Sequence, residues 1–203
     1  MINKTLKIFV KNPEIGKVKT RLAATVGDQE ALKIYHHLLS YTQKVVLKVD
    51  TKKEVWYSKY VDESDLWAGE LFIKKEQRGM DLGIRMKTAF QDSFLEDMHA
   101  QVVLIGSDCA ELESCHINKA FEQLKSNDIV IGPAKDGGYY LIGMSKFLPA
   151  VFDDINWSTA EVLTQTIEKI NTLNSSYYLL ETLSDIDHFE DWEKIKDRVL
   201  SND

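Results

Sequence analysis

Apolar runs alternate with helical patterns along the chain, and this alternation most limits the folds open to it. Short apolar runs predict strands, and longer segments with apolar residues three and four apart predict helices. Strands that alternate with helices form a mostly parallel sheet covered by helices, which places the chain in the α/β class. The expected strands are 5–10, 53–58, 70–74, 101–106, 128–132, 138–144 and 177–181. The expected helices are 28–49, 81–94, 114–125, 158–171 and 188–200, with Asp28, Ser114 and Ser158 as N-caps.

Length and composition limit the number of domains and the classes of partner that the chain can have. At 203 residues and 44% hydrophobic, with no linker or repeat, the sequence predicts one domain over residues 1–203. No apolar run approaches the ~20 residues of a membrane span and no signal-type segment opens the chain, so we expect a cytoplasmic protein. A net charge of -7 argues against a nucleic-acid partner. Cys109 and Cys115 lack the spacing of a zinc site or a disulfide framework, and the scattered histidines suggest no catalytic triad.

A basic segment, residues 11–21, directly follows the first expected strand. It carries four cations and one acid in an otherwise acidic chain, and Pro13 and Gly16 favour a turn over a helix. A P-loop is excluded, because Lys11 and Val18 stand where that motif has glycine and Ser or Thr. The segment is either a solvated basic turn or an anion-binding loop, and its charge favours the loop. The cations expected to bind phosphate are Lys11, Lys17, Lys19 and Arg21.

Asp108 follows the continuous apolar run 102–106, which predicts a central strand buried on both faces. Ligands of open α/β sheets bind at the carboxyl ends of the strands, so Asp108 is placed to meet a phosphate-bound metal, with magnesium the best suited. The alternative is that Asp108 caps a turn, although Ser114 is available to cap the next helix.

Two further acidic segments are less specific. Asp136 precedes Gly137 and Gly138 between two expected strands, and this pattern fits either a hairpin turn or a close approach to a ligand. Asp185 and Asp187 open the last helix, where the helix dipole alone favours acids. In an extended segment, however, the two side chains point the same way and can share a cation.

Two other segments give only weak signals by themselves. Gln77, Gly79 and Gly83 begin the second expected helix, where glycines let the backbone approach a base or ribose. The segment 157–159, Trp-Ser-Thr, fits an N-cap beside a packed aromatic ring, or a polar corner facing a ligand.

In this order, six motifs resemble a single bacterial family: KNPEIGKVKTRL, QRGMDLGIRM, IGSDCAEL, GPAKDGGYYLIG, WST and DIDHFED. It is the glycosyltransferase-A-type family long labelled a domain of unknown function, some of whose members are assigned to arsenosugar biosynthesis. The resemblance spans about residues 6–192, and it implies a Rossmann-like sheet with a nucleotide in its N-terminal half. The family is similar in fold to the guanylyltransferases that act on molybdopterin and phospholactate. Ala110, where a proline is usual, and the pair His188-Phe189, where Thr-Pro is common, depart from the pattern.

The resemblance also implies roles for residues. Lys17, Lys19 and Arg21 would hold the nucleotide phosphates, and Gln77, Gly79 and Gly83 would line the base or ribose. Asp108 would bind Mg²⁺ or Mn²⁺, with Asp185 and Asp187 completing the metal site or facing the second substrate. The acceptor side is expected at Gly137, Gly138, Trp157, Ser158 and Thr159.

The main hypothesis is a metal-dependent glycosyltransferase with a nucleotide-activated sugar donor and a small-molecule acceptor. Asp108 and Asp136 are its expected catalytic residues, with Asp136 orienting or deprotonating the acceptor. The alternative is a guanylyltransferase-like nucleotidyltransferase, which moves NMP from NTP to a phosphorylated small molecule and uses the same loop and metal. A non-catalytic nucleotide-sugar sensor would need the loop but not the acids. Whether the protein forms a homo-oligomer stays open.

Overall fold

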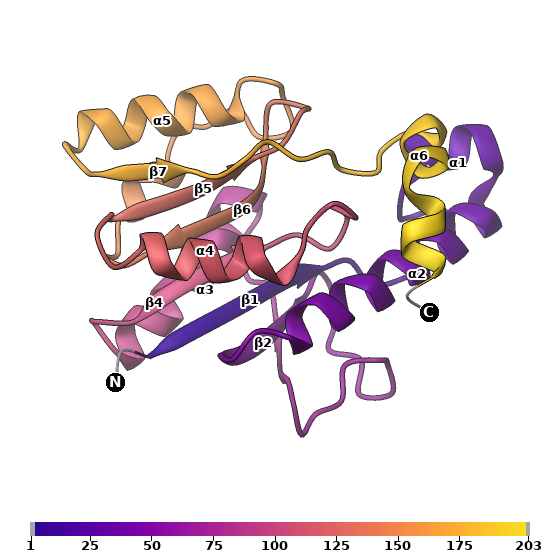
Figure 1. The fold of residues 1–203 in the computed structure, drawn as a ribbon, viewed down its shortest axis with the longest axis horizontal. Helices are drawn as coiled ribbons and strands as arrows, with labels where there is room; N and C mark the ends of the chain where they lie inside the picture. The colour runs from indigo at the N-terminus through magenta and orange to yellow at the C-terminus, as the bar shows by residue number, and fades with distance from the viewer. Residues whose placement is uncertain (1–2, 202–203) are drawn as a thin grey trace.

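A seven-stranded sheet runs through the centre of the protein, whose computed structural model describes residues 3–201 (Figure 1). The strand order is β3-β2-β1-β4-β6-β5-β7. Among the described strands, β6 runs antiparallel to its two neighbours, and the other neighbouring pairs are parallel. The mostly parallel sheet is therefore confirmed. The strands are β1 (Lys4–Val10), β2 (Lys52–Tyr57), β3 (Ile73–Glu76), β4 (Gln101–Ile105), β5 (Ile129–Pro133), β6 (Tyr139–Met144) and β7 (Tyr177–Leu179).

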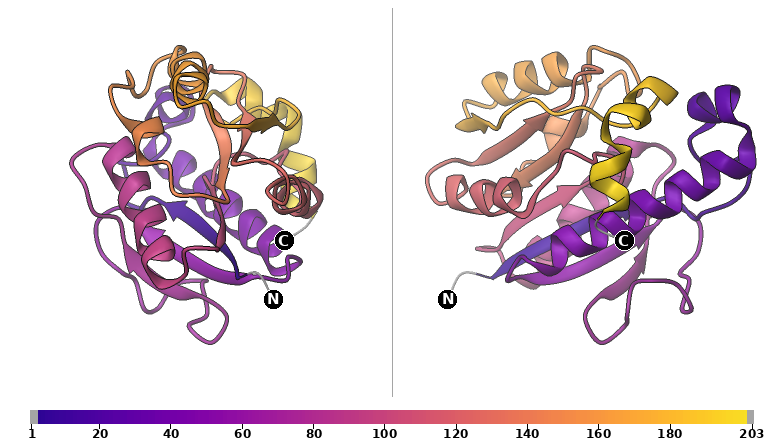
Figure 2. Two further views of the ribbon diagram at one scale, coloured as in Figure 1. Left: turned by 90° about the vertical axis from the view of Figure 1, so that its left-hand side faces the viewer. Right: turned by 45° about the vertical axis from the view of Figure 1, so that its right-hand side comes forward.

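Helices cover both faces of this sheet (Figure 2). The side chains of β1 alternate between them: Leu6 and Ile8 join one apolar cluster, and Phe9 joins the other. The first cluster contains residues of α2 (Asp28–Leu47), α4 (Ser114–Gln123) and α6 (Phe189–Leu200), with the short α1 (Thr20–Val26) packed on α2 and α6. The second contains residues of α3 (Leu82–Glu96), the 3₁₀ helix η1 (Pro149–Phe152) and α5 (Val162–Thr172).

The seven expected strands are all present, but several details differ from the sequence prediction. Helix α1 was not expected, since a turn was predicted to fill the basic segment through Arg21. The three proposed N-caps are wrong: the cap positions belong to Gly27, Glu113 and Glu161. Gly27, with φ 82°, takes the cap position because it joins α1 directly to α2. Within residues 3–201, no helix is both long and apolar enough to cross a membrane.

One ion pair is fully buried on the α3 face of the sheet. Lys7 on β1 and Glu54 on β2 lie side by side in the parallel register, and their side chains are 0% exposed. The Lys7 Nζ lies 2.5 Å from Glu54 Oε2, and Trp56 Nε1 donates to the same oxygen at 3.1 Å. Burial lowers the pKa of Lys7 although Glu54 opposes the shift. Such a pair is costly to break, because the partner left behind becomes an uncompensated buried charge.

Candidate functional site

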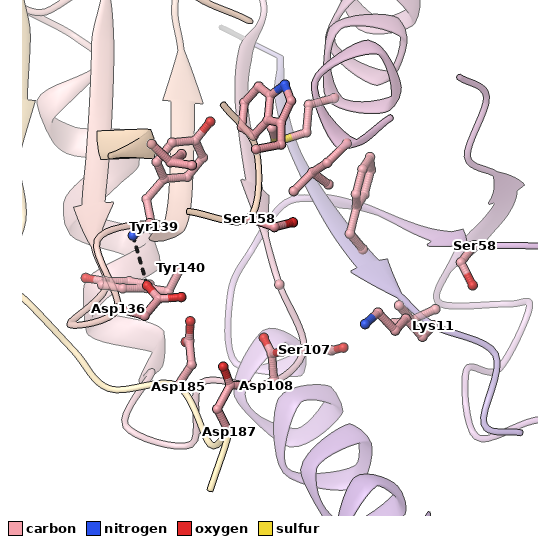
Figure 3. Close-up of a pocket in the computed structure, with 18 of the residues that line it drawn as sticks. Lys11, Ser58, Ser107, Asp108, Asp136, Tyr139, Tyr140, Ser158, Asp185 and Asp187 are labelled. Atoms are coloured by element: carbon pink, nitrogen blue, oxygen red, sulfur yellow. Dashed lines mark hydrogen bonds between the residues drawn. The ribbon is translucent and has the colours of Figure 1, made fainter. Parts of the chain in front are cut away.

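A cavity of about 710 Å³ opens at the sheet edge where β1 and β4 end and β6 begins (Figure 3). This is the carboxyl edge of the parallel strands, the ordinary ligand position in open α/β sheets. The loop 11–21 forms one wall, and the first turn of α3 adds another. The opposite wall is built from the residues after β4, the hairpin between β5 and β6, the segment 157–160, and the acids that precede α6.

The loop 11–21, which we call the cationic loop, is held by polar contacts at its base. The buried side chain of Asn12 accepts from the backbone N–H of Lys59 at 3.0 Å and donates to the carbonyl of Tyr60 at 2.9 Å. The hydroxyl of Tyr35 on α2 accepts from the N–H of Lys11 at 2.9 Å and donates to its carbonyl at 3.0 Å. These contacts orient the loop so that all four of its cations line the cavity: Lys11, Lys17, Lys19 and Arg21.

Lys19 is the most constrained of these cations. Its backbone is left-handed, with φ 47° and ψ 46°, and its side chain is only 5% exposed. The Nζ donates to Asp108 Oδ2 at 3.0 Å and lies 3.7 Å from Asp187 Oδ1. Arg21 also reaches Asp187, with Nη1 2.8 Å from Oδ2, although its own side chain is largely exposed. The predicted phosphate ligands Lys19 and Arg21 therefore face the predicted metal ligands.

Four carboxylates, which we call the acidic cluster, lie near one another on the cavity wall: those of Asp108, Asp136, Asp185 and Asp187 (Figure 3). The sequence analysis named all four, and the fold brings them together from three separate segments. The backbone N–H of Ile186 donates to the carbonyl of Asp108 at 3.0 Å, which fastens the segment before α6 to the end of β4. Asp136 Oδ1 accepts from the N–H of Gly138 at 2.9 Å, at the tip of the β5–β6 hairpin.

The pKa values of Asp108 and Asp185 are shifted in opposite directions. Burial alone would raise the pKa of Asp108, but the ammonium of Lys19, with a smaller contribution from Lys11, holds it below its usual range. Burial and the nearby charge of Asp108 raise the pKa of Asp185 to about 8, with Asp136 adding to the shift. The buried Oδ1 of Asp185 has no hydrogen-bond partner in the described part of the chain. One member of the cluster is thus stabilised as an anion, whereas burial and like charges favour the protonated form of another despite the nearby Lys19.

These observations test whether a divalent metal fits. Oxygen ligands of carboxylates are what Mg²⁺ and Mn²⁺ prefer, and the unpartnered Oδ1 of Asp185 fits a missing cation. Within residues 3–201, however, no three His, Cys, Asp or Glu side chains are grouped so that they could hold an ion by themselves. The arrangement therefore suits a metal that takes one or two protein carboxylates and completes its shell with phosphate oxygens and water, as Mg²⁺ commonly does.

Of the three residues predicted to contact a base or ribose, one lines the cavity and two do not. Gln77 lines the cavity, and its amide donates to the carbonyls of Val10 at 3.2 Å and Trp56 at 2.8 Å. Gly79 and Gly83 do not line the cavity but shape the start of α3. A Cβ at Gly83 would lie 2.4 Å from the indole nitrogen of Trp157, so the helix can pack against that ring only through glycine.

The residues predicted on the acceptor side form the far wall. Gly138, Trp157, Ser158 and Thr159 line the cavity. Gly137 has φ 90°, and a Cβ there would lie 2.2 Å from a backbone carbonyl oxygen of the neighbouring segment 157–160. The hairpin tip thus packs against that segment with no room for a side chain.

Several residues that line the cavity were not predicted from the sequence. Arg85 lines the cavity, and its Nε donates to the carbonyl of Gly79 at 3.0 Å. Its position in the first turn of α3, shortly after Gly79 and Gly83, is the sequence signal that could have predicted it. Tyr139 carried no separate signal in its apolar strand. Tyr35 on α2, whose hydroxyl also lies 3.4 Å from Ser107 Oγ, could be found only from the three-dimensional structure.

Comparison with proteins of known structure identifies the fold. A Desulfovibrio desulfuricans G20 protein assigned as a nucleotide-diphospho-sugar transferase superposes with a TM-score of 0.83 and 35% identity, over 93% of this chain and 84% of that one. The inositol-1-phosphate CTP transferase of T. maritima superposes with a TM-score of 0.64 at 14% identity, over 99% of this chain and 96% of that one. At such low identity the second comparison shows the fold alone. The chain therefore has the nucleotide-diphospho-sugar transferase fold.

Sequence comparison gives the family. The 2-phospho-L-lactate guanylyltransferase of Methanocaldococcus jannaschii is 26% identical over 140 residues, which make up 68% of this chain and 58% of that enzyme. The matched stretch thus spans little more than half of the relative. The model of the family described as "Uncharacterized protein conserved in bacteria (DUF2064)" matches residues 41–159. This match covers more than half of the chain and confirms the resemblance drawn from the six motifs, so the chain belongs to the DUF2064 family.

Proposed function

We propose that the protein is a metal-dependent glycosyltransferase that passes a sugar from a nucleotide-activated donor to a small-molecule acceptor. One observation carries the proposal: the cationic loop and the acidic cluster line the same cavity at the carboxyl edge of the sheet and meet where Lys19 pairs with Asp108. A nucleoside diphosphate bound there would meet the loop cations and, beside them, carboxylates that can reach a phosphate-bound metal. The likeness to the Desulfovibrio protein supports the same substrate class.

The cationic loop would stabilise the leaving group. As the bond between the sugar and the diphosphate breaks, negative charge collects on the departing phosphate oxygens. Lys17, Lys19 and Arg21 line the cavity and can donate to those oxygens. Because the contacts of Asn12 and Tyr35 fix the loop in advance, little reorganisation is needed when the charge develops.

Asp108 and Asp185 would hold the divalent ion, Mg²⁺ or Mn²⁺, with Asp187 beside them. When bound, the ion neutralises diphosphate charge and so makes the nucleoside diphosphate a better leaving group. Two observations support these ligands: Lys19 keeps Asp108 anionic, and Oδ1 of Asp185 has no hydrogen-bond partner among the described residues.

Asp136 would act on the acceptor. It stands at the hairpin tip on the far wall, beside Gly138 and close to the segment 157–159. A carboxylate in this position can accept a hydrogen bond from an acceptor hydroxyl, orient it and take its proton as the new bond forms.

Nucleotidyl transfer is the second candidate, and the similarity to a guanylyltransferase is the observation that favours it. In that reaction an acceptor phosphate attacks the α-phosphorus of a nucleoside triphosphate, and pyrophosphate leaves. The cationic loop would then stabilise pyrophosphate instead of a nucleoside diphosphate.

The released product separates the two reactions. A thermal-shift panel of nucleotide sugars and nucleoside triphosphates, each with Mg²⁺ or Mn²⁺, first selects the ligands that raise the melting temperature. Incubation with candidate acceptors then yields a nucleoside diphosphate for glycosyl transfer and pyrophosphate for nucleotidyl transfer. Release of neither product, with tight binding retained, would indicate a sensor. Asp108→Asn should abolish the metal dependence of nucleotide binding, and a variant that keeps it would place the metal elsewhere.

A further inference from the structure

Lys19 puts an ammonium group among the carboxylates that the proposed function gives to a metal. Its Nζ is 3.0 Å from Asp108 Oδ2 and 3.7 Å from Asp187 Oδ1, and only 5% of the side chain is exposed. A metal bound to Asp108 would lie about 2.1 Å from a carboxylate oxygen, so it would come within a few ångströms of this ammonium. Two cations cannot share so small a space without strong repulsion.

The contact is built into the loop and is not an ordinary surface ion pair. The left-handed backbone of Lys19, at φ 47°, is uncommon for a residue with a side chain and aims Nζ into the acidic cluster. Lys17, two residues earlier, is exposed and makes no ion pair among the described residues. The two lysines carry the same charge and line the same cavity, yet of the two only Lys19 contacts the carboxylates.

The rest of the cluster agrees with a cation position that is already filled. Asp108 and Asp187 share the ammonium, and Asp187 also accepts from Arg21 at 2.8 Å. Asp185 feels the charge of Lys19, but its Oδ1 finds no hydrogen-bond partner within residues 3–201. An ion that entered now would have to displace Lys19, and the described side chains would still not supply three ligands.

We propose that Lys19 occupies the cation position in the ligand-free protein, so that the metal enters only together with the nucleotide. The nucleotide phosphates would draw the Lys19 ammonium away from Asp108 and at the same time supply the oxygen ligands that the protein lacks. This inference rests on the proposed function and adds to it an order of binding: metal and nucleotide each raise the affinity for the other. By linkage the two increases are equal.

The test measures Mn²⁺ binding in the absence of nucleotide, by electron paramagnetic resonance of the free ion. Lys19→Gly removes the ammonium, and glycine adopts a φ of 47° without strain. Lys17→Gln is the matched control, since it removes one positive charge from the same loop but no carboxylate contact. Lys19→Gly should bind Mn²⁺ about tenfold or more tightly than the wild type, within the usual range of coupling between sites. Lys17→Gln should bind it like the wild type, and adding Asp108→Asn to Lys19→Gly should remove the gain.

The wild type supplies a second measurement that needs no Lys19 variant. Titration with GDP and UDP by calorimetry should show nucleotide affinity rising about tenfold or more when Mn²⁺ is present. In Lys19→Gly, or in Lys19→Gln if the glycine variant does not fold, this increase should shrink. A wild type that binds Mn²⁺ as tightly alone as with nucleotide, or a folded Lys19 variant with no gain in Mn²⁺ affinity, would overturn the inference while leaving the proposed function intact. If neither nucleotide binds, ADP, CDP and dTDP are titrated in the same way, and a wild type that binds none of the five would overturn the proposed function and this inference with it.

Discussion

Replacing Asp185 by Asn should make the metal-free protein more stable, and the gain should grow as the pH rises. Burial and the neighbouring carboxylates raise the pKa of Asp185 to about 8 in the folded protein, against 3.8 for an ordinary Asp. Below about pH 4 both the folded and the unfolded chain carry this proton, so it has no effect on stability. Between about pH 4 and pH 8 the folded chain keeps the proton while the unfolded chain has lost it. Each increase in pH therefore favours unfolding, and the loss levels off above about pH 8.

The size of the effect follows from the shift. A shift of about four pKa units at about 1.36 kcal/mol each sets an upper bound of about 6 kcal/mol on the stability lost by the wild type. Because the side chain is not fully buried and shares its titration with Asp108, we expect about 3 kcal/mol between pH 5 and pH 8. The amide introduced by Asp185→Asn does not ionise, so this variant should escape the loss.

The assay is urea unfolding in the presence of a chelator, at one-unit steps from pH 5 to pH 9. Asp50→Asn, at an exposed position, controls for the removal of one negative charge. The stability difference between Asp185→Asn and the wild type should widen from pH 5 to pH 8, while Asp50→Asn should follow the wild type. Parallel curves for Asp185→Asn and the wild type would refute the reasoning.

Three further changes test other parts of the structure. Asp136→Asn should retain metal-dependent nucleotide binding in calorimetry but lose transfer in a product assay; loss of binding would move Asp136 to the donor side. Glu54→Gln should cost about 3–5 kcal/mol in urea unfolding, because Lys7 is left as an uncompensated buried charge, and a cost below about 1 kcal/mol would contradict this reading. Gly137→Ala should lower the melting temperature well below that of Gly69→Ala, since a Cβ at Gly69 meets nothing within 4 Å; equal melting temperatures would mean that the hairpin tip has room to adjust.

The strands were predictable because their apolar runs are short, dense and separated by turn residues. The edge strand β3 was placed about three residues too early, since Ile73 and its neighbours are half-exposed and carry little periodic signal. Helix α1 was missed because its seven residues begin inside the cationic segment, where Gly16 and Pro13 indicate a turn. Its formation depends on packing against α2 and α6, which no local pattern reports.

For the site, the rule that ligands bind at the carboxyl edge of a parallel sheet was enough to select Asp108. The pairing of Lys19 with Asp108 joins residues 89 positions apart, and no local periodicity predicts it. The same holds for the unpartnered oxygen of Asp185, which depends on burial by segments distant in sequence. Sequence patterns thus predicted which charged residues line the cavity, whereas their pairing required the structure.

The contact between Arg21 and Asp187 joins residues 166 positions apart. During synthesis the N-terminal strands and the cationic loop leave the ribosome long before Asp187 has been made. A nascent chain that ends before Asp185 would therefore carry the basic wall of the cavity without half of its acidic wall. Such a chain would expose unpaired cations, a surface open to nonspecific polyanions, until the segment after β7 crosses from the sheet edge to α6 (Figure 1). The cavity is thus among the last parts of the molecule to be completed, although its cationic loop is among the first to be synthesised.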